Sequence, residues 1–324
     1  LADLKECYPV EVSEWAIASE LGDEPAFNWW VHHALKKRDR IISLVKQRQT
    51  RYLKKTHKFG VELPKSVRLA YELDKKNGNT FWADAISKEM KNVRVAFRIK
   101  DEDEIPKNVY QRIKCHMIFD VKMEDFRCKA RMVAGGHMTE TPKCMTYSSV
   151  VARDTVRVAL TLAALNGIEV KAGDVMNVYI TAPIEEKVWT VLGSEFGDDA
   201  GKAAIIVRAL YGLKSSGAAW RNMFAQFIEK ELGFKPTRID PDVYLKRAAK
   251  PSGEEYYQLL LVYVDDVLLI SHAPKDVMEQ ISQKFEIKNN EIGPPKFYLG
   301  AEIERYNVKG DRDTIIGSYW SMSS

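Results

Sequence analysis

The chain has 324 residues and a mass of 37.0 kDa; 45% of its residues are hydrophobic and 29% are charged. These fractions are typical of a globular protein of about two domains, and they exclude collagen-like, mucin-like and wholly disordered chains. A net charge of +4 is too small to indicate a partner by itself, and no apolar run approaches the roughly 20 residues of a membrane span. Four cysteines without a C-x-x-C pair favour a reducing compartment over a disulfide scaffold.

Positive charge is concentrated in the first predicted helix, which we expect over about residues 28–55. Ten basic residues lie between Lys36 and Lys58, against one acidic residue, Asp39. Such a cluster is typical of a surface that binds a polyanion, because each neutralised phosphate releases counterions. A solvated helix face would carry the same charges. The candidate nucleic-acid-binding residues are Lys36, Lys37, Arg38 and Arg40.

The next elements have clear periodicity. In chain order we expect a capped amphipathic helix over 80–90, short strands over 110–133 around a turn at 123–125, a helix over 154–166 with Asp154 as its N-cap, and a strand over 168–174.

The second half of the chain continues this mixture. We expect strands at 188–192 and 204–207 that could pair, a helix over 218–232 whose aromatic stripe we interpret as core, an apolar hairpin over 256–271, a helix opened by Pro274, and a final strand over 297–303. Because helices and strands alternate irregularly and without βαβ spacing, the sequence predicts an α+β fold.

The acidic residues in the predicted hairpin carry the strongest chemical signal. Asp265 and Asp266 lie between two aliphatic runs, where two ionised carboxylates cost several kcal/mol each unless a cation compensates them. Magnesium is the natural compensator, because it takes carboxylate oxygens together with substrate phosphates. Neighbouring strand positions point to opposite faces, so a third acid is needed. The candidate is Asp174 at the end of a predicted strand, although an acid in that position is more often a cap or turn residue.

A zinc site is a second metal hypothesis. The cysteine and histidine residues between 115 and 144 are numerous enough to suggest one, but their gaps match no pattern that closes a tetrahedral site. Ordinary buried or surface thiols explain them better.

Four ordered motifs carry a resemblance: DVMNVY (174–179), LYGLK (210–214) with Trp220, YVDD (263–266) and YLG (298–300). Together they resemble the reverse transcriptase of copia-type long-terminal-repeat retrotransposon polyproteins, over about residues 80–305. The basic run resembles the region that joins integrase to reverse transcriptase in such polyproteins.

The resemblance implies a right-hand polymerase fold with fingers and palm. It implies an upstream linker and basic region over 1–79, fingers over 80–167, and a palm over 168–308 with fingers elements near 185–220. Residues 309–324 would begin the next segment, so we expect a fragment from which most of the thumb is missing. The implied activity is RNA-directed DNA synthesis from deoxynucleoside triphosphates, with an RNA template, a DNA primer and two Mg²⁺ ions, for which Mn²⁺ is an alternative.

The resemblance also implies roles for individual residues. Asp174 and Asp265 would be the principal metal ligands and Asp266 the supporting acid. Tyr179 would be the gate that excludes a ribose 2′-hydroxyl, which requires a bend after Asp174, and its alternative role is core packing. The implied nucleotide-binding residues are Lys129, Arg131, Tyr179, Gly212 and Lys214, and the implied primer-binding residues are Tyr263, Leu299 and Gly300.

Several positions depart from the family pattern. Residues 215–218 read Ser-Ser-Gly-Ala where the family usually has Gln-Ser-Pro-Arg, and Met176 stands where the family usually has lysine. These departures leave a second hypothesis open, a catalytically decayed retrotransposon remnant that acts only as a nucleic-acid-binding protein. The resemblance further implies a cytoplasmic virus-like particle, with the nucleus as an alternative location, and no membrane partner; the sequence leaves the oligomeric state open.

Overall fold

The computed structural model describes residues 56–324 except 124, 289–291, 300, 310–314 and 324. The chain separates into two compact units, Leu1–Leu63 and Pro64–Ser324, and the described part has the mixed α+β composition that the sequence predicts. Of the first unit, the structure describes a hairpin of β1 (His57–Lys58) and β2 (Val61–Glu62). The predicted helix over 28–55 and its basic residues lie outside the described residues. None of the helices in the described ranges combines the length and the apolar composition that a membrane span needs.

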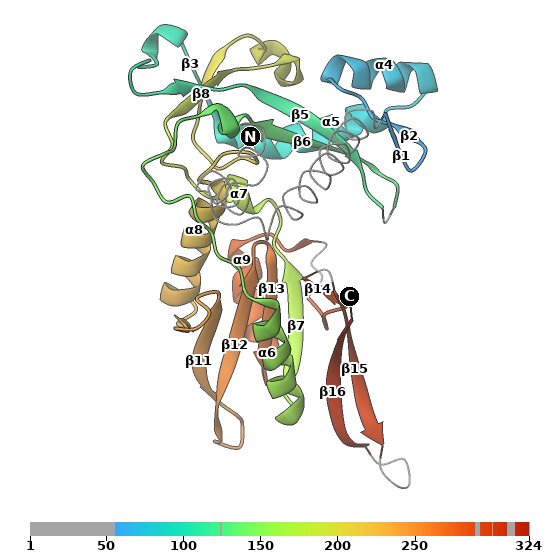
Figure 1. Cartoon of the computed structure of the whole chain (residues 1–324), viewed down its shortest axis with the longest axis vertical. Helices are drawn as coiled ribbons and strands as arrows, with labels where there is room; N and C mark the ends of the chain where they lie inside the picture. The colour runs from blue at the N-terminus through green and yellow to red at the C-terminus, as the bar shows by residue number, and fades with distance from the viewer. Residues whose placement is uncertain (1–55, 124, 289–291, 300, 310–314, 324) are drawn as a thin grey trace, which may run out of the picture. The chain divides into compact units, whose positions relative to one another are not determined.

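The second unit is built around an antiparallel sheet of five strands in the order β10-β11-β12-β13-β7 (Figure 1). The apolar run over 256–271 forms the central pair, β12 and β13, which confirms the predicted hairpin. The strand bounds are β10 (Lys235–Pro236), β11 (Val243–Ala249), β12 (Glu255–Tyr263), β13 (Asp266–Ser271) and β7 (Glu169–Asp174).

Helices cover both faces of this sheet, because its central strands are apolar on both sides. On one face α6 (Arg153–Leu165) packs with Leu261 and Leu268. On the other face α8 (Ser216–Lys230) and α9 (Pro274–Lys284) pack with Leu260 and Leu269. Neighbouring residues of a strand point to opposite faces, so each strand contributes to both cores. The sheet is therefore fixed from both sides.

A second group of elements surrounds the hairpin of β5 (Cys115–Val121) and β6 (Cys128–Ala134), which confirms the strands predicted over 110–133. Helix α5 (Phe81–Val93) packs against it, with the ring of Trp82 edge-on to Phe119 at 5.5 Å. A further sheet has the order β3-β9-β8-β4 and confirms the predicted pairing of 188–192 with 204–207. Its strands are β3 (Phe97–Lys100), β9 (Ala203–Ile206), β8 (Val188–Val191) and β4 (Gln111–Arg112).

Short helices and one longer helix complete this group. Their bounds are α4 (Val67–Asn77), η2 (Arg94–Ala96), η3 (Glu102–Glu104), η4 (Gly136–Met138) and η5 (Ser194–Asp199). The short helix α7 (Val178–Thr181) packs instead with α8 in the core of the five-stranded sheet.

The caps of two predicted helices come from distant carboxylates. The first amides of α5, those of Trp82 and Ala83, donate to the buried side chain of Asp74 at 3.1 and 2.8 Å. The prediction of Asp154 as an N-cap is wrong, because α6 begins one residue earlier, at Arg153, and Asp154 lies in its first turn. The backbone N–H of the cap residue Ala152 donates instead to Asp240, at 3.0 Å.

The prediction of one strand over 297–303 is also wrong. Leu299 takes a positive φ of 53°, and the chain turns there between β14 (Phe297–Tyr298) and β15 (Ala301–Lys309). The two strands pair antiparallel, and β15 continues its pairing with β16 (Ile315–Ser323). The apolar pattern indicated strand correctly, but it did not reveal the reversal in the middle.

Candidate active site

The turn between β12 and β13 holds one acidic residue at a fixed tip. Tyr263 pairs with Asp266, which leaves Val264 and Asp265 as a two-residue turn. Val264 has φ 56°, a conformation that costs a β-branched residue about 1–3 kcal/mol. The indole Nε1 of Trp220 in α8 donates to the Val264 carbonyl at 2.6 Å. The core helix therefore helps to hold the strained turn that presents Asp265.

The structure brings the three predicted acids together at this end of the sheet. Asp174, the last residue of β7, lies directly opposite Asp266 in the register between β7 and β13. Directly opposed residues of an antiparallel pair share one face. The backbone N–H of Val175 donates to the carbonyl of Asp265 at 2.8 Å, so the tip is also tied to the strand end. Acidic residues about 90 positions apart in the sequence thus become neighbours.

The carboxyl groups are crowded at this end of the sheet although burial disfavours their charged forms. Burial raises the pKa of the Asp266 carboxyl to about 6, and the charges of Asp265 and Asp174 add to the rise. Burial also raises the pKa of Asp265, with a further contribution from Asp174, while Arg131 and Lys288 oppose that rise. Such crowding is typical of carboxylates that serve a cation or a reaction.

Lys288 is a site residue that sequence reasoning missed. Its Nζ lies 3.0 Å from Oδ2 of Asp174, in a partly buried ion pair. The alternation of buried Phe285 and Ile287 with polar neighbours was the available signal, since it places Lys288 on the opposite side from those apolar residues. The identity of its partner depends on a contact between segments 114 residues apart, which no local pattern contains.

The donor set fits a hard divalent cation in its chemistry. Carboxylate oxygens are the ligands that Mg²⁺ prefers, and the ammonium of Lys288 already supplies positive charge at Asp174. Across the described ranges, however, no three acidic, histidine or cysteine side chains are arranged closely enough to hold a metal ion. The site therefore has metal-binding groups that are close together but not converged on one point, and the zinc hypothesis gains no support from the same ranges.

Arg131 and Tyr179 both contact Tyr211 near Asp265. The guanidinium of Arg131 in β6 lies over the ring of Tyr211, 4.0 Å from its centroid. The ring of Tyr179 meets the same ring edge-on, with centroids 4.9 Å apart. Burial raises the pKa of Tyr179, and the negative charge of Asp265 adds to the rise. Arg131 and Tyr179, both predicted as nucleotide-binding residues, are thus linked by Tyr211, to which the sequence analysis gave no role.

The bend that the gate hypothesis requires is present. Strand β7 ends at Asp174, Asn177 takes φ 53°, and Tyr179 lies in the short helix α7. A straight strand would have directed Tyr179 away from Asp174.

The other predicted nucleotide-binding residues have mainly structural contacts. Lys129 shares a face of β6 with Arg131, and burial, followed by the charges of Arg131 and Lys122, lowers the pKa of Lys129. Gly212 has φ 91° and leaves no room for a side chain, because an added Cβ would lie 2.1 Å from the Ala134 carbonyl oxygen. The Nζ of Lys214 donates to the carbonyl of Thr139 at 2.5 Å, so this ammonium is engaged by the backbone of a neighbouring loop.

The predicted primer residues lie on the α6 side of the sheet. Tyr263 and Leu299 both pack against the core cluster on that side, which also contains the buried Tyr298. Burial raises the pKa of Tyr298 well above its usual value, and the charge of Asp266 adds to the rise, so this cluster lies near the acids. Gly300 and the basic residues Lys36, Lys37, Arg38 and Arg40 lie outside the described residues.

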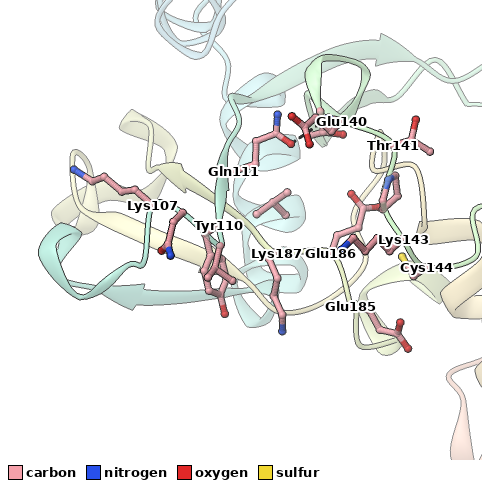
Figure 2. A pocket seen from close by; sticks show the side chains of 15 residues that line it. Lys107, Tyr110, Gln111, Glu140, Thr141, Lys143, Cys144, Glu185, Glu186 and Lys187 are labelled. Carbon is pink, nitrogen blue, oxygen red and sulfur yellow. Dashed lines mark hydrogen bonds between the residues drawn. The ribbon is translucent and has the colours of Figure 1, made fainter.

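Two pockets lie near these elements. The larger, of about 600 Å³, is bordered by segments around Tyr110, Glu140 and Lys187 and contains none of the predicted site residues (Figure 2). A smaller pocket of about 230 Å³ is lined by Tyr179, Trp220 and Val264 and therefore adjoins the acidic turn. The carboxylate cluster, and not the larger of these two pockets, is the candidate site.

The comparison with known protein families identifies the chain. The family model described as "Reverse transcriptase (RNA-dependent DNA polymerase)" matches residues 98–310, which include all three acids and the Arg131–Tyr211–Tyr179 cluster. The chain belongs to the reverse transcriptase family. This result confirms the resemblance stated from the four sequence motifs.

Curated relatives place this reverse transcriptase among retrotransposon polyproteins. The chain is 31% identical over 216 residues to the "Retrovirus-related Pol polyprotein from transposon TNT 1-94" of Nicotiana tabacum, a match that covers 62% of this chain and 15% of that protein. It is 26% identical over 221 residues to the "Transposon Ty1-MR1 Gag-Pol polyprotein" of Saccharomyces cerevisiae, a match that covers 65% of this chain and 12% of that protein. The chain thus spans a small part of the length of these polyproteins.

Proposed function

We propose that this reverse transcriptase chain is an RNA-directed DNA polymerase domain that extends a DNA primer on an RNA template. The supporting observation is the meeting of Asp174, Asp265 and Asp266 at one end of a rigid sheet. Family membership supports nucleic acid and deoxynucleoside triphosphates as substrates. The five-stranded sheet with its helices would be the palm of a right-hand polymerase, and the group around the β5–β6 hairpin would belong to the fingers.

In this proposal each acid has a defined neighbourhood. Asp174 and Asp265 would be the principal ligands of Mg²⁺ or Mn²⁺, with Asp266 as the supporting acid. Bound metal would lower the pKa of the primer 3′-hydroxyl and neutralise charge on the leaving pyrophosphate. The nearby guanidinium of Arg131 would bind the triphosphate, and the ring of Tyr179 would exclude a ribose 2′-hydroxyl. Tyr263 and Leu299, on the α6 side, would contact the primer end.

Primer extension with Mg²⁺ or Mn²⁺ on an RNA template tests this function. The 324-residue chain and its Asp265→Asn variant would be assayed side by side. We expect this change, which removes one ligand charge, to lower extension by at least about 10³-fold. The matched control is Asp154→Asn, which neutralises a surface acid in α6 and should leave extension unchanged.

Equal activity of the Asp265→Asn variant and the parent chain would reject the assignment. If neither form extends a primer but both bind RNA with a steep salt dependence, the decayed remnant that only binds nucleic acid becomes the better account. The departures at 215–218 and Met176 are the observations that favour this second function.

A further inference from the structure

The ring of Tyr211 is the shared contact of two residues that come from separate parts of the unit. Arg131 in β6 places its guanidinium over the ring face, at 4.0 Å from the centroid. Tyr179 in α7 places its own ring at the edge, at 4.9 Å and an interplanar angle of 75°. Both geometries are attractive, because the ring face carries negative and the ring edge positive partial charge.

The backbone of Tyr211 is locked to the strand that carries Arg131. The N–H of Ala134 donates to the Tyr211 carbonyl at 2.7 Å, and Val133 and Tyr211 form a parallel β-bridge. The following Gly212 fits against the Ala134 carbonyl with no space for a side chain. The backbone of Tyr211 is therefore fixed relative to β6, and its ring contacts both Arg131 and Tyr179.

The partners of this ring differ in chemistry. Arg131 offers a positive charge with planar donors, which suits phosphate oxygens. Tyr179 offers a flat steric surface. Both lie near Asp265, since the Arg131 charge opposes the pKa rise of Asp265 and the Asp265 charge raises that of Tyr179.

We propose that Tyr211 is a positioning residue of the nucleotide site, whose ring sets the positions of the Arg131 guanidinium and the Tyr179 ring together. This inference rests on the proposed polymerase function. It makes one residue that touches no reacting atom responsible for two properties, the affinity for the triphosphate and the discrimination between deoxyribose and ribose.

Steady-state incorporation of one deoxynucleotide, and of the matching ribonucleotide, tests the proposal. Tyr211→Leu removes the ring, and we expect KM for the deoxynucleotide to rise about tenfold and the preference for deoxyribose to fall about tenfold, with kcat changed by less than about threefold. Tyr211→Phe keeps the ring and should restore both properties. Arg131→Lys keeps the charge but loses the planar contact, so it should raise KM and leave the sugar preference in place.

A matched control separates this role from a loss of packing. Tyr110→Leu removes a half-buried ring that carries the ammonium of Lys187 at 5.9 Å and lies at the other pocket, so it should leave KM and sugar preference unchanged. Tyr211→Met, whose unbranched side chain is longer than that of leucine and adapts to irregular gaps, replaces Tyr211→Leu if that variant does not fold.

The proposal is overturned if Tyr211→Leu retains parental KM and sugar preference, or changes only one of them. It is also overturned if Tyr211→Phe behaves like Tyr211→Leu, because the hydroxyl and not the ring would then be responsible. A parent chain that incorporates no nucleotide refutes the proposed function instead. In that case added deoxynucleoside triphosphate should still raise the Tm of the parent chain by binding to it. We expect this rise in Tm to be lost in Tyr211→Leu if the ring positions the nucleotide site.

Discussion

The fold places Asp266 where its charged form is disfavoured. Its folded pKa of about 6 lies above the ordinary value of 3.8, because burial and the neighbouring acids disfavour the ionised form. An acid with a raised folded pKa contributes stability that is fully present below the unfolded pKa and is lost as the pH rises through the folded pKa. Between about pH 4 and 6 this residue therefore makes the metal-free fold progressively less stable.

Replacing Asp266 by a neutral residue should remove this loss of stability with rising pH. For the metal-free chain at pH 7.5 we expect Asp266→Asn to raise the free energy of unfolding by about 1–2 kcal/mol, after allowance for partial exposure. Each kcal/mol corresponds to about 2–4 °C in Tm. At pH 4 the variant and the parent should melt together. Thermal unfolding from pH 4 to 8 in the presence of a chelator is the measurement.

The surface acid Asp198 in η5 offers the control for this experiment. Asp198→Asn should show no such pH-dependent gain. If Asp266→Asn melts below the parent at pH 7.5 under these conditions, the repulsion inferred for the acidic cluster is wrong.

At the scale of elements, the joint between β6 and the 210–214 turn contains a glycine, Gly212, that leaves no room for a side chain. Gly212 has φ 91°, and an added Cβ would lie 2.1 Å from the Ala134 carbonyl oxygen. Gly253, in the β11–β12 loop, has a similar φ of 87° but open space around it. The two positions separate the cost of the backbone conformation from the cost of a collision.

Alanine substitution at both glycines should therefore give unequal effects. We expect Gly253→Ala to cost about 1–2 kcal/mol from its positive φ alone, and Gly212→Ala to cost about 3 kcal/mol or more, because the backbone must also move. Urea unfolding of the two variants measures the difference. Equal losses would show that the turn can shift away from β6 without cost.

Elements were predictable where the pattern is local. The aliphatic runs on either side of Asp265 and Asp266 define the hairpin, and the helix predicted over 218–232 is α8, Ser216–Lys230. What failed depends on distant partners: Asp74 supplies the α5 cap, and the reversal at Leu299 comes from a residue without a turn preference.

The residues of the candidate site also differ in how well the sequence alone predicts them. Asp174, Asp265 and Asp266 could be chosen because charged groups among apolar strands need an explanation. Lys288 and Tyr211 could not, since neither is unusual until Asp174 and Arg131 lie beside them. The acids that the proposal uses for chemistry could be recognised in the sequence, whereas Lys288 and Tyr211, which contact other residues of the candidate site, could not.

At the scale of the whole molecule, the division into two compact units allows the two proposed roles, nucleic-acid binding and catalysis, to be tested separately. The unit from Pro64 onward contains the described cores and all three acids. We expect residues 64–324 alone to fold with a Tm within about 4 °C of the full chain, because no described core residue is removed. Calorimetry of the two chains checks this.

The basic residues of the first unit should instead control the salt dependence of RNA binding. Changing Lys36, Lys37, Arg38 and Arg40 to glutamine should reduce the slope of log K against log salt by about 3, since each lost contact to single-stranded phosphate removes about 0.7. The control changes Lys65, Lys75, Lys88 and Lys91, which are exposed on the second unit, to glutamine. If both sets reduce the slope equally, the N-terminal cluster has no special role.

The pairing of Asp174 with Asp266 across β7 and β13 has a consequence for how copies of such an element lose function. A substitution in a loop leaves the ladder aligned. Deleting one codon within β7 moves Asp174 to the reverse surface of the sheet, so it would face away from Asp266 although both acids remain encoded. Under the proposed function such a copy would keep every acidic codon and lose its site, so the intact length of β7 is a better guide to a working copy than the acids alone.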